Sequence, residues 1–117
     1  MKIQLKSLMD CLIIDCLIVV MLSLVIVAEV WPQTGGDRIA RGKQIYSEKQ
    51  CAICHMVQGK GGKSGPDLSD VGTKRDPQWL KRFLMSPSTV IPEAKMPSFK
   101  GSADEREVLV AYLLSLH

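Results

Sequence analysis

One long apolar run divides the 117-residue chain into two unequal parts. The run extends from Cys11 to Val30 and contains two acidic residues but no Lys or Arg. A helix of about twenty residues rises about 30 Å, which matches the hydrocarbon thickness of a bilayer. Trp31 follows where an interfacial aromatic residue is expected, and Pro32 ends the helix. We therefore expect residues 1–35 to form an N-terminal transmembrane anchor with a short linker, and residues 36–117 to form the folded domain.

A cleaved secretory signal is the alternative interpretation of the first segment. The residue before the cut would be Ala28, although Ile26 is a poor small residue two places earlier. The run is also longer than the apolar stretch of about 7–15 residues that is usual in a signal. In both cases Lys2 and Lys6 precede the run, which predicts that the N-terminus stays inside and that residues 36–117 face outward.

The part of the chain that follows the run is small for a domain. About 80 residues lie near the lower limit for a chain that must build its own core, so we expect a disulfide, a metal or a large cofactor to support it. The chain carries a net charge of +3, its charges are mixed along the sequence, and two Trp and two Phe are available to stack on bases. This composition argues against nucleic-acid binding.

The most specific motif of the sequence is Cys51-Ala52-Ile53-Cys54-His55. This is the C-x-x-C-H pattern of covalent c-type haem attachment. Two thiols at this spacing on one helical turn can both reach the vinyl groups on one edge of a porphyrin, and the adjacent imidazole then lies beneath the iron as an axial ligand. A dithiol redox pair would need a βαβ pattern around it, and a zinc site would need four ligands. The motif therefore predicts one covalently attached haem c, held by Cys51, Cys54 and His55.

A second axial ligand of the iron is expected from a loop later in the domain. Met96 lies 41 residues after His55, and Pro97 holds it in an extended conformation. Met85 falls in the apolar pattern of a predicted helix, where we expect it to pack. His117 is the other His of the chain, but a C-terminal residue just past a helix is a poor candidate. We predict Met96 as the ligand, and a thioether raises the reduction potential relative to a second His.

Further residues stand in a fixed order around the haem motif. They are Gly42 and Tyr46, Gly65-Pro66-Asp67-Leu68, Trp79-Leu80, Met96-Pro97-Ser98-Phe99 and Tyr112-Leu113. Together with the motif, this pattern resembles a class I monohaem c-type cytochrome over nearly all of residues 36–117. The resemblance implies that the carbonyl of Pro66 accepts a hydrogen bond from the axial His55, which fixes its tautomer. It also implies that Arg75 and Trp79 lie near the haem propionates.

The predicted fold class is all-α, with one N-terminal transmembrane helix followed by a small cytochrome c fold around one covalent haem. Gly36-Asp37 opens a helix that extends to about Lys49, and Gly42 lets this helix approach Tyr112 of the last helix closely. The last helix begins at a capping box. Its box is Ser102-Ala103-Asp104-Glu105, and its inner face is Val108, Tyr112 and Leu116, with Leu109 and Leu113 beside it.

A short helix and a loop are expected between these two helices. Asp76 is a favourable N-cap and Pro77 a favourable first helical residue, and Ser86-Pro87 ends the helix. Residues 59–65 contain four Gly and are predicted to form a flexible loop beside the haem.

These features predict one-electron transfer by a single haem, without a substrate reaction and therefore without catalytic residues. The expected partners are membrane-embedded redox proteins of a respiratory or photosynthetic chain, with no small-molecule substrate and no nucleic acid. The expected location is the bacterial inner membrane, with a single pass and the haem domain on the periplasmic side.

Two other functions remain open on the sequence. Cleavage after Ala28 would release a soluble periplasmic electron shuttle. An open iron site would permit ligand sensing or catalysis, and it would require that Met96 does not bind or that it leaves on reduction. Binding of carbon monoxide to the reduced protein distinguishes an open site from a tight Met–iron bond.

Overall fold

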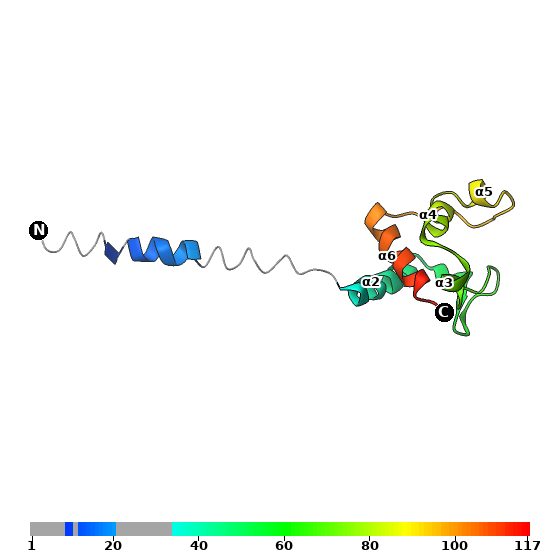
Figure 1. Ribbon diagram of the computed structural model, residues 1–117, viewed down its shortest axis with the longest axis horizontal. Coiled ribbons are helices and arrows are strands. Elements are labelled where there is room, and N and C mark those ends of the chain that lie inside the picture. Colours follow the sequence, from blue (N-terminus) through cyan, green and yellow to red (C-terminus); the bar gives the residue numbers. More distant parts are fainter. Residues whose placement is uncertain (1–8, 11, 21–33) are drawn as a thin grey trace, which may run out of the picture. The chain divides into compact units, whose positions relative to one another are not determined.

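The computed structural model describes residues 9–10, 12–20 and 34–117 (Figure 1). The chain divides into two units, Met1–Pro32 and Gln33–His117. In the first unit, residues 12–20 are helical and exposed. Within the described residues, no helix combines the length and the apolar character needed to cross a bilayer. More than half of the predicted span, residues 11 and 21–30, lies outside the described residues, so the anchor and its linker stay a prediction.

The first long helix of the second unit, α2, spans Gly35–Glu48. The hydroxyl of Thr34 accepts a hydrogen bond from the Asp37 N–H, and the Asp37 carboxylate accepts one from the Thr34 N–H at 3.1 Å. This reciprocal pair is a capping box, which satisfies two backbone donors that have no partner within the helix. The predicted start at Gly36-Asp37 is therefore one residue late, because the cap is Thr34.

Two further helices begin where the sequence predicts. In α4 (Pro77–Met85), the side chain of Asp76 accepts a hydrogen bond from the Trp79 N–H at 2.9 Å, and Pro77 occupies the first turn. In α6 (Ala103–Leu114), Ser102 and Glu105 form the predicted capping box, with N–H···O distances of 3.1 and 2.8 Å. Both predicted helix starts are therefore confirmed. Such starts can be predicted from the sequence because a cap acts within one turn of the chain.

The structure also contains short elements that the sequence analysis missed. They are η2 (Cys51–Ile53), α3 (Val71–Lys74), α5 (Pro87–Val90), and an antiparallel hairpin of β1 (Met56–Val57) with β2 (Lys60–Gly61). The predicted all-α class is corrected to a mostly helical fold with one small hairpin. Gln58 and Gly59 reverse the chain with φ angles of 49° and 76°. The loop predicted over residues 59–65 is corrected in part, because Lys60–Gly61 form β2, whereas residues 62–65 contain no helix or strand. The Gly62 N–H donates to the Ala52 carbonyl at 2.8 Å.

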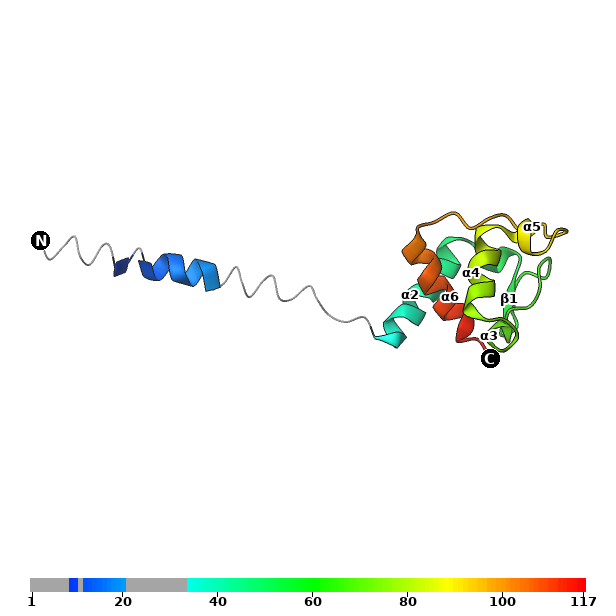
Figure 2. The ribbon, with the colours of Figure 1, turned by 45° about the horizontal axis from the view of Figure 1, so that its top comes forward.

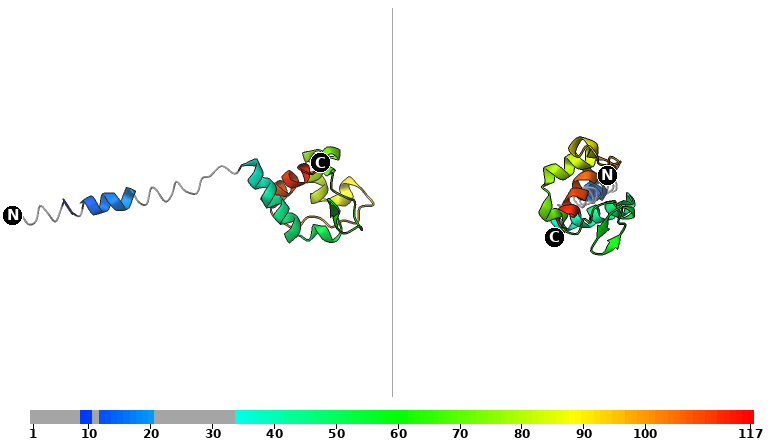
Figure 3. Two further views of the ribbon diagram at one scale, coloured as in Figure 1. Left: turned by 90° about the horizontal axis from the view of Figure 1, so that it is seen from below. Right: turned by 90° about the vertical axis from the view of Figure 1, so that its right-hand side faces the viewer.

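The helices α2 and α6 cross and pack side by side (Figures 2 and 3). At the crossing, a Cβ on Gly42 would overlap the carbonyl oxygen of Val108 and lie 2.6 Å from the Cβ of Tyr112. The rings of Tyr46 and Tyr112 meet edge to face beside this contact, with centroids 5.6 Å apart. The predicted close approach of Gly42 to the last helix is therefore confirmed.

The core forms where α6 packs against three other helices, α2, α3 and α4. Four of the five residues predicted for the inner face of the last helix are buried, although Leu116 lies after the end of α6. Val108 is only half-buried, and Val110 is buried instead. Contact with several helices makes the buried face of α6 wider than a single apolar stripe. The core residues are Ile45, Tyr46, Val71, Leu80, Leu84, Leu109, Val110, Tyr112, Leu113 and Leu116.

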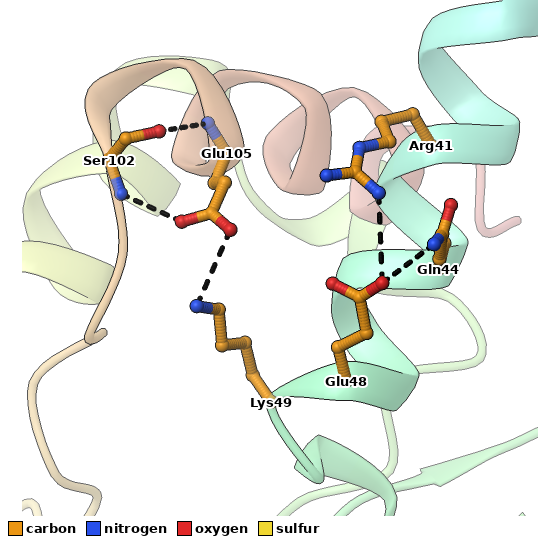
Figure 4. A network of polar contacts seen from close by, with 6 residues as sticks. All are labelled: Arg41, Gln44, Glu48, Lys49, Ser102 and Glu105. Atoms are coloured by element: carbon orange, nitrogen blue, oxygen red, sulfur yellow. Dashed lines mark hydrogen bonds and ion pairs between the residues drawn. The ribbon is translucent and has the colours of Figure 1, made fainter.

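A polar network joins the end of α2 to the start of α6 (Figure 4). The Lys49 ammonium lies 3.4 Å from a carboxylate oxygen of Glu105, and the other oxygen of Glu105 accepts the Ser102 N–H at 2.8 Å. The Ser102 hydrogen bond, with a smaller effect of Lys49, holds the pKa of Glu105 below its ordinary value of 4.5. Within α2, Glu48 accepts from Gln44 at 2.6 Å and pairs with Arg41 at 3.7 Å.

Substitution Gly42→Ala should lower the free energy of unfolding by about 2–3 kcal/mol, because the new methyl group cannot fit between the two helices. Denaturant unfolding of the holoprotein measures the change. Gly35→Ala is the matched control, since a Cβ at Gly35 in the same helix meets no atom within 4 Å. Equal stability of the Gly42→Ala variant and the wild type would contradict this account of the crossing.

Substitution Glu105→Gln should destabilise the protein at pH 7 and have a decreasing effect as the pH falls below 4.5. A carboxylate whose pKa is lowered by folding stabilises the native state above its unfolded pKa, and this contribution is lost as the pH falls through the folded pKa. Unfolding titrations of both proteins at several pH values test the prediction. The control is Glu93→Gln in an exposed loop position, and a pH-independent loss of stability in Glu105→Gln would refute the electrostatic explanation.

Candidate functional site

A cavity of about 240 Å³ lies within the second unit. Its walls come from α2, α4 and α6 and from the loops around the haem motif. Of the seven residues predicted for the site, six line this cavity and Cys54 does not. The six are Cys51, His55, Pro66, Arg75, Trp79 and Met96. Residues from opposite ends of the domain sequence are therefore brought to one place.

The C-x-x-C-H motif folds as a tight 3₁₀ turn rather than as a turn of α-helix. The N–H groups of Cys54 and His55 both donate to the Cys51 carbonyl, at 3.2 and 2.9 Å. Cys51 is half-buried and Cys54 is exposed. Burial raises the pKa of the Cys51 thiol, whereas a redox-active dithiol depends on a lowered thiol pKa. The environment of Cys51 therefore argues against dithiol redox chemistry.

His55 is buried, with 9% of its surface exposed, and its ring is held in one orientation. Its Nδ1 lies 2.9 Å from the Pro66 carbonyl oxygen, which accepts a hydrogen bond from that nitrogen. The other ring nitrogen, Nε2, is left to bind a metal ion. A Cβ on Gly65 would lie 2.7 Å from the His55 Cε1, so the backbone at Gly65 closes against the imidazole ring.

The backbone of His55 is held from the other side by α2. The buried hydroxyl of Tyr46 donates to the His55 carbonyl oxygen at 3.1 Å. Burial, with a smaller effect of Cys51, raises the pKa of Tyr46 to about 12. The hydroxyl therefore keeps its proton and acts as a donor at physiological pH. Tyr46 was not predicted as a site residue, although it lies only nine residues before His55 in the sequence.

The three candidates for a second axial ligand are placed very differently. Met96 is half-buried and is the methionine among the cavity-lining residues. Met85 is 57% exposed, so the expectation that it packs is wrong. Met85 follows Lys81 and Arg82 by four and three residues, and it therefore shares their polar face of α4. His117 is exposed at the C-terminus and does not line the cavity.

Arg75 and Trp79 form a stacked group at the cavity. The guanidinium of Arg75 lies 4.2 Å from the centroid of the Trp79 ring, and the Trp79 and Phe83 rings stack with centroids 4.8 Å apart. Arg75 is exposed, whereas Trp79 and Phe83 are half-buried.

Lys74 and Ile91 also line the cavity. They were not predicted as site residues, because their proximity to the motif depends on tertiary contacts.

The residues present at this cavity fit a haem. Cys51 supplies a thiol at the cavity, and the second thiol of the motif, Cys54, lies three residues further along the chain. His55 supplies a free ring nitrogen, and Met96 supplies a thioether. Most other lining residues are apolar, and the charged ones are exposed. These charged residues are Asp67, Lys74 and Arg75. An apolar wall with charged groups toward solvent suits a planar apolar ring with ionised substituents.

Comparison with curated proteins identifies relatives among redox proteins. The chain is 28% identical over 85 residues to "Cytochrome c oxidase subunit 2" of Alkalihalophilus pseudofirmus, covering 65% of this chain and 25% of the relative. It is 32% identical over 79 residues to "Menaquinol:cytochrome c reductase cytochrome c subunit" of Bacillus subtilis, covering 66% and 28%. It is 30% identical over 95 residues to "Cytochrome c 2.1" of Caenorhabditis elegans, covering 62% and 84%. The chain thus spans about a quarter of the two bacterial relatives.

A family model described as cytochrome c matches residues 39–117, which include the motif, the cavity and the core. The cofactor of this family is covalently attached haem c, and both cysteines of the motif fall within the matched residues. The chain therefore belongs to the cytochrome c family.

Proposed function

We propose that the protein is a monohaem electron carrier that is tethered to a membrane and serves a membrane redox complex. The observation that carries the proposal is the cavity that Cys51, His55 and Met96 line together, with His55 Nδ1 held by the Pro66 carbonyl. When bound there, the haem supplies an iron that cycles between the ferric and ferrous states. No residue of the cavity is assigned a catalytic role, and the protein acts on no small-molecule substrate.

Each residue of the site has a distinct task in this proposal. Cys51 and Cys54 hold the group covalently, and His55 and Met96 bind the two faces of the iron. The Pro66 carbonyl keeps the His55 proton on Nδ1, which directs Nε2 to the metal. Arg75 and Trp79, which line the cavity, would lie near the ionised propionates of the group. The apolar walls exclude water and keep the change in solvation on electron transfer small.

The tether is supported by the sequence rather than by the described residues. The apolar run from Cys11 to Val30 is long enough for one membrane pass, and Lys2 and Lys6 lie before it. Because α2 begins at Gly35, the linker from Trp31 to Thr34 can extend about 14 Å at most, which would keep the domain near the membrane surface. We place the domain on the periplasmic side of a bacterial inner membrane.

The partners follow from the tether and from the relatives. Two relatives are named as subunits of a menaquinol:cytochrome c reductase and of a cytochrome c oxidase. We therefore propose that electrons pass between this haem and membrane-embedded redox proteins of a respiratory or photosynthetic chain. A short tether raises the effective concentration of the haem at such partners.

The intact mass of the protein from fractionated native cells tests the tether and the cofactor together. We expect the full chain plus one haem in the membrane fraction. A chain that begins near Glu29 and carries haem in the soluble fraction would show a diffusible shuttle instead of a tethered carrier. A mass without haem would reject the whole proposal.

Substitution Met96→Ala tests the second axial ligand. We expect the midpoint potential to fall by roughly 0.1 V, a fraction of the ~0.8 V range that axial ligands span. We also expect the ferrous variant to bind carbon monoxide rapidly, because the sixth position is open. Potentiometric titration and carbon monoxide mixing measure the two effects. The matched control is Met85→Ala, an exposed methionine away from the cavity, and equal behaviour of the two variants would exclude Met96 as the ligand.

A further inference from the structure

The segment that carries Met96 has little secondary structure of its own. Residues 91–102 connect α5 to α6 without a helix or a strand. After Met96, the backbone of this segment is tied to a helix by the Phe99 N–H, which donates to the Leu84 carbonyl at 2.8 Å. Because Phe99 lies three residues after Met96 and Pro97 restricts the chain between them, the position of Phe99 limits where the Met96 sulfur can lie.

The ring of Phe99 has two close neighbours, Lys49 at the end of α2 and Gly101 of its own segment. The Lys49 ammonium lies 5.7 Å from the ring centroid, within the range of a cation–π contact. Gly101, two residues further along the chain, lies so close to the ring that a Cβ there would be 2.6 Å from the Phe99 Cε1. The ring is half-buried and packs against the hydrophobic core. Lys49 thus covers a ring that the core alone does not enclose.

Lys49 is itself held in place by a second partner. It caps the C-terminus of α2, and its ammonium pairs with Glu105 at 3.4 Å (Figure 4). Its side chain is 30% exposed and that of Glu105 is 26% exposed. Glu105 in turn is fixed by the capping box with Ser102. One ammonium therefore contacts the start of α6 and the Met96 segment, from a position two residues before the haem motif.

We propose that Lys49 is a positioning residue that holds Phe99, and through Phe99 keeps the Met96 sulfur at the iron. The proposal rests on the proposed function, because it requires Met96 as an axial ligand. An ion pair that only joined α2 to α6 would stabilise the fold without any specific effect on Met96. The contact of the same ammonium with Phe99 is what distinguishes the two roles.

The chain offers a matched control for Lys49. Lys81 on α4 pairs with Glu107 of α6 at 2.7 Å, and its side chain is also 30% exposed. Substitutions Lys49→Gln and Lys81→Gln each remove one ion pair to α6, but Lys49→Gln also removes the cation above Phe99. Lys49→Arg retains a cation that can contact both the ring and the carboxylate, and it serves as the rescue variant.

Three measurements on the holoprotein test the proposal. The ferrous wild type should show the methyl resonance of Met96 shifted by the haem ring current, which reports the ligand. In Lys49→Gln, amide hydrogen exchange at Phe99 and the rate of carbon monoxide binding should each rise about threefold, as expected for the loss of a partly exposed cation–π contact. Lys49→Arg should remain near the wild type, and Lys81→Gln should lose stability without either change.

The outcomes separate this proposal from the one on which it rests. The wild type can show the shifted Met96 resonance while Lys49→Gln and Lys81→Gln have equal rates of amide exchange at Phe99 and of carbon monoxide binding. This result would overturn the role of Lys49 alone. A wild type without that resonance would overturn the assignment of Met96 and this inference with it. If Lys49→Gln does not accumulate, Phe99→Leu replaces it, and it should accelerate carbon monoxide binding more than Lys49→Gln is expected to.

Discussion

The crossing of α2 and α6 at Gly42 is the contact on which the rest of the domain depends. The backbones approach so closely that no side chain fits at Gly42, and this proximity places Tyr46 against Tyr112. Tyr46 of α2 and Leu109 and Leu113 of α6 then line the same cavity. The packing of the first helix on the last therefore forms part of the wall of the site as well as the core. In a domain of about 80 residues, such sharing is expected because few side chains are available for a separate core.

One side-chain hydroxyl and one backbone carbonyl determine how the imidazole is presented. The Tyr46 hydroxyl holds the His55 carbonyl, and the Pro66 carbonyl holds the His55 Nδ1. The segment that follows β2 contains Gly62 and Gly65 and lies directly on the motif. A Cβ at Gly62 would overlap the Ile53 carbonyl, and one at Gly65 would press on the His55 ring. These two glycines are thus required for the close approach of the backbone to the motif.

The features that the sequence predicted correctly are those set by neighbouring residues. The caps at Asp76 and Ser102 act within one turn, so the starts of α4 and α6 follow from a few letters. The hairpin was missed because its strands have two residues each and its turn contains Gln58 in a left-handed conformation, which is not a strong turn signal. Met85 was misplaced because a short apolar pattern does not show which positions of a nine-residue helix face the solvent.

By itself, the sequence determined the chemistry of the site. The C-x-x-C-H spacing is a local pattern, and few prosthetic groups other than haem c could use it. It also indicated a long apolar segment, to which the proposed function assigns the role of a membrane tether. Only the tertiary structure decided which distant groups meet that motif. Pro66 lies 11 residues after His55, Met96 lies 41 residues after His55, and Phe99 lies 50 residues after Lys49. Their proximity is a property of helix packing, and no local pattern encodes it.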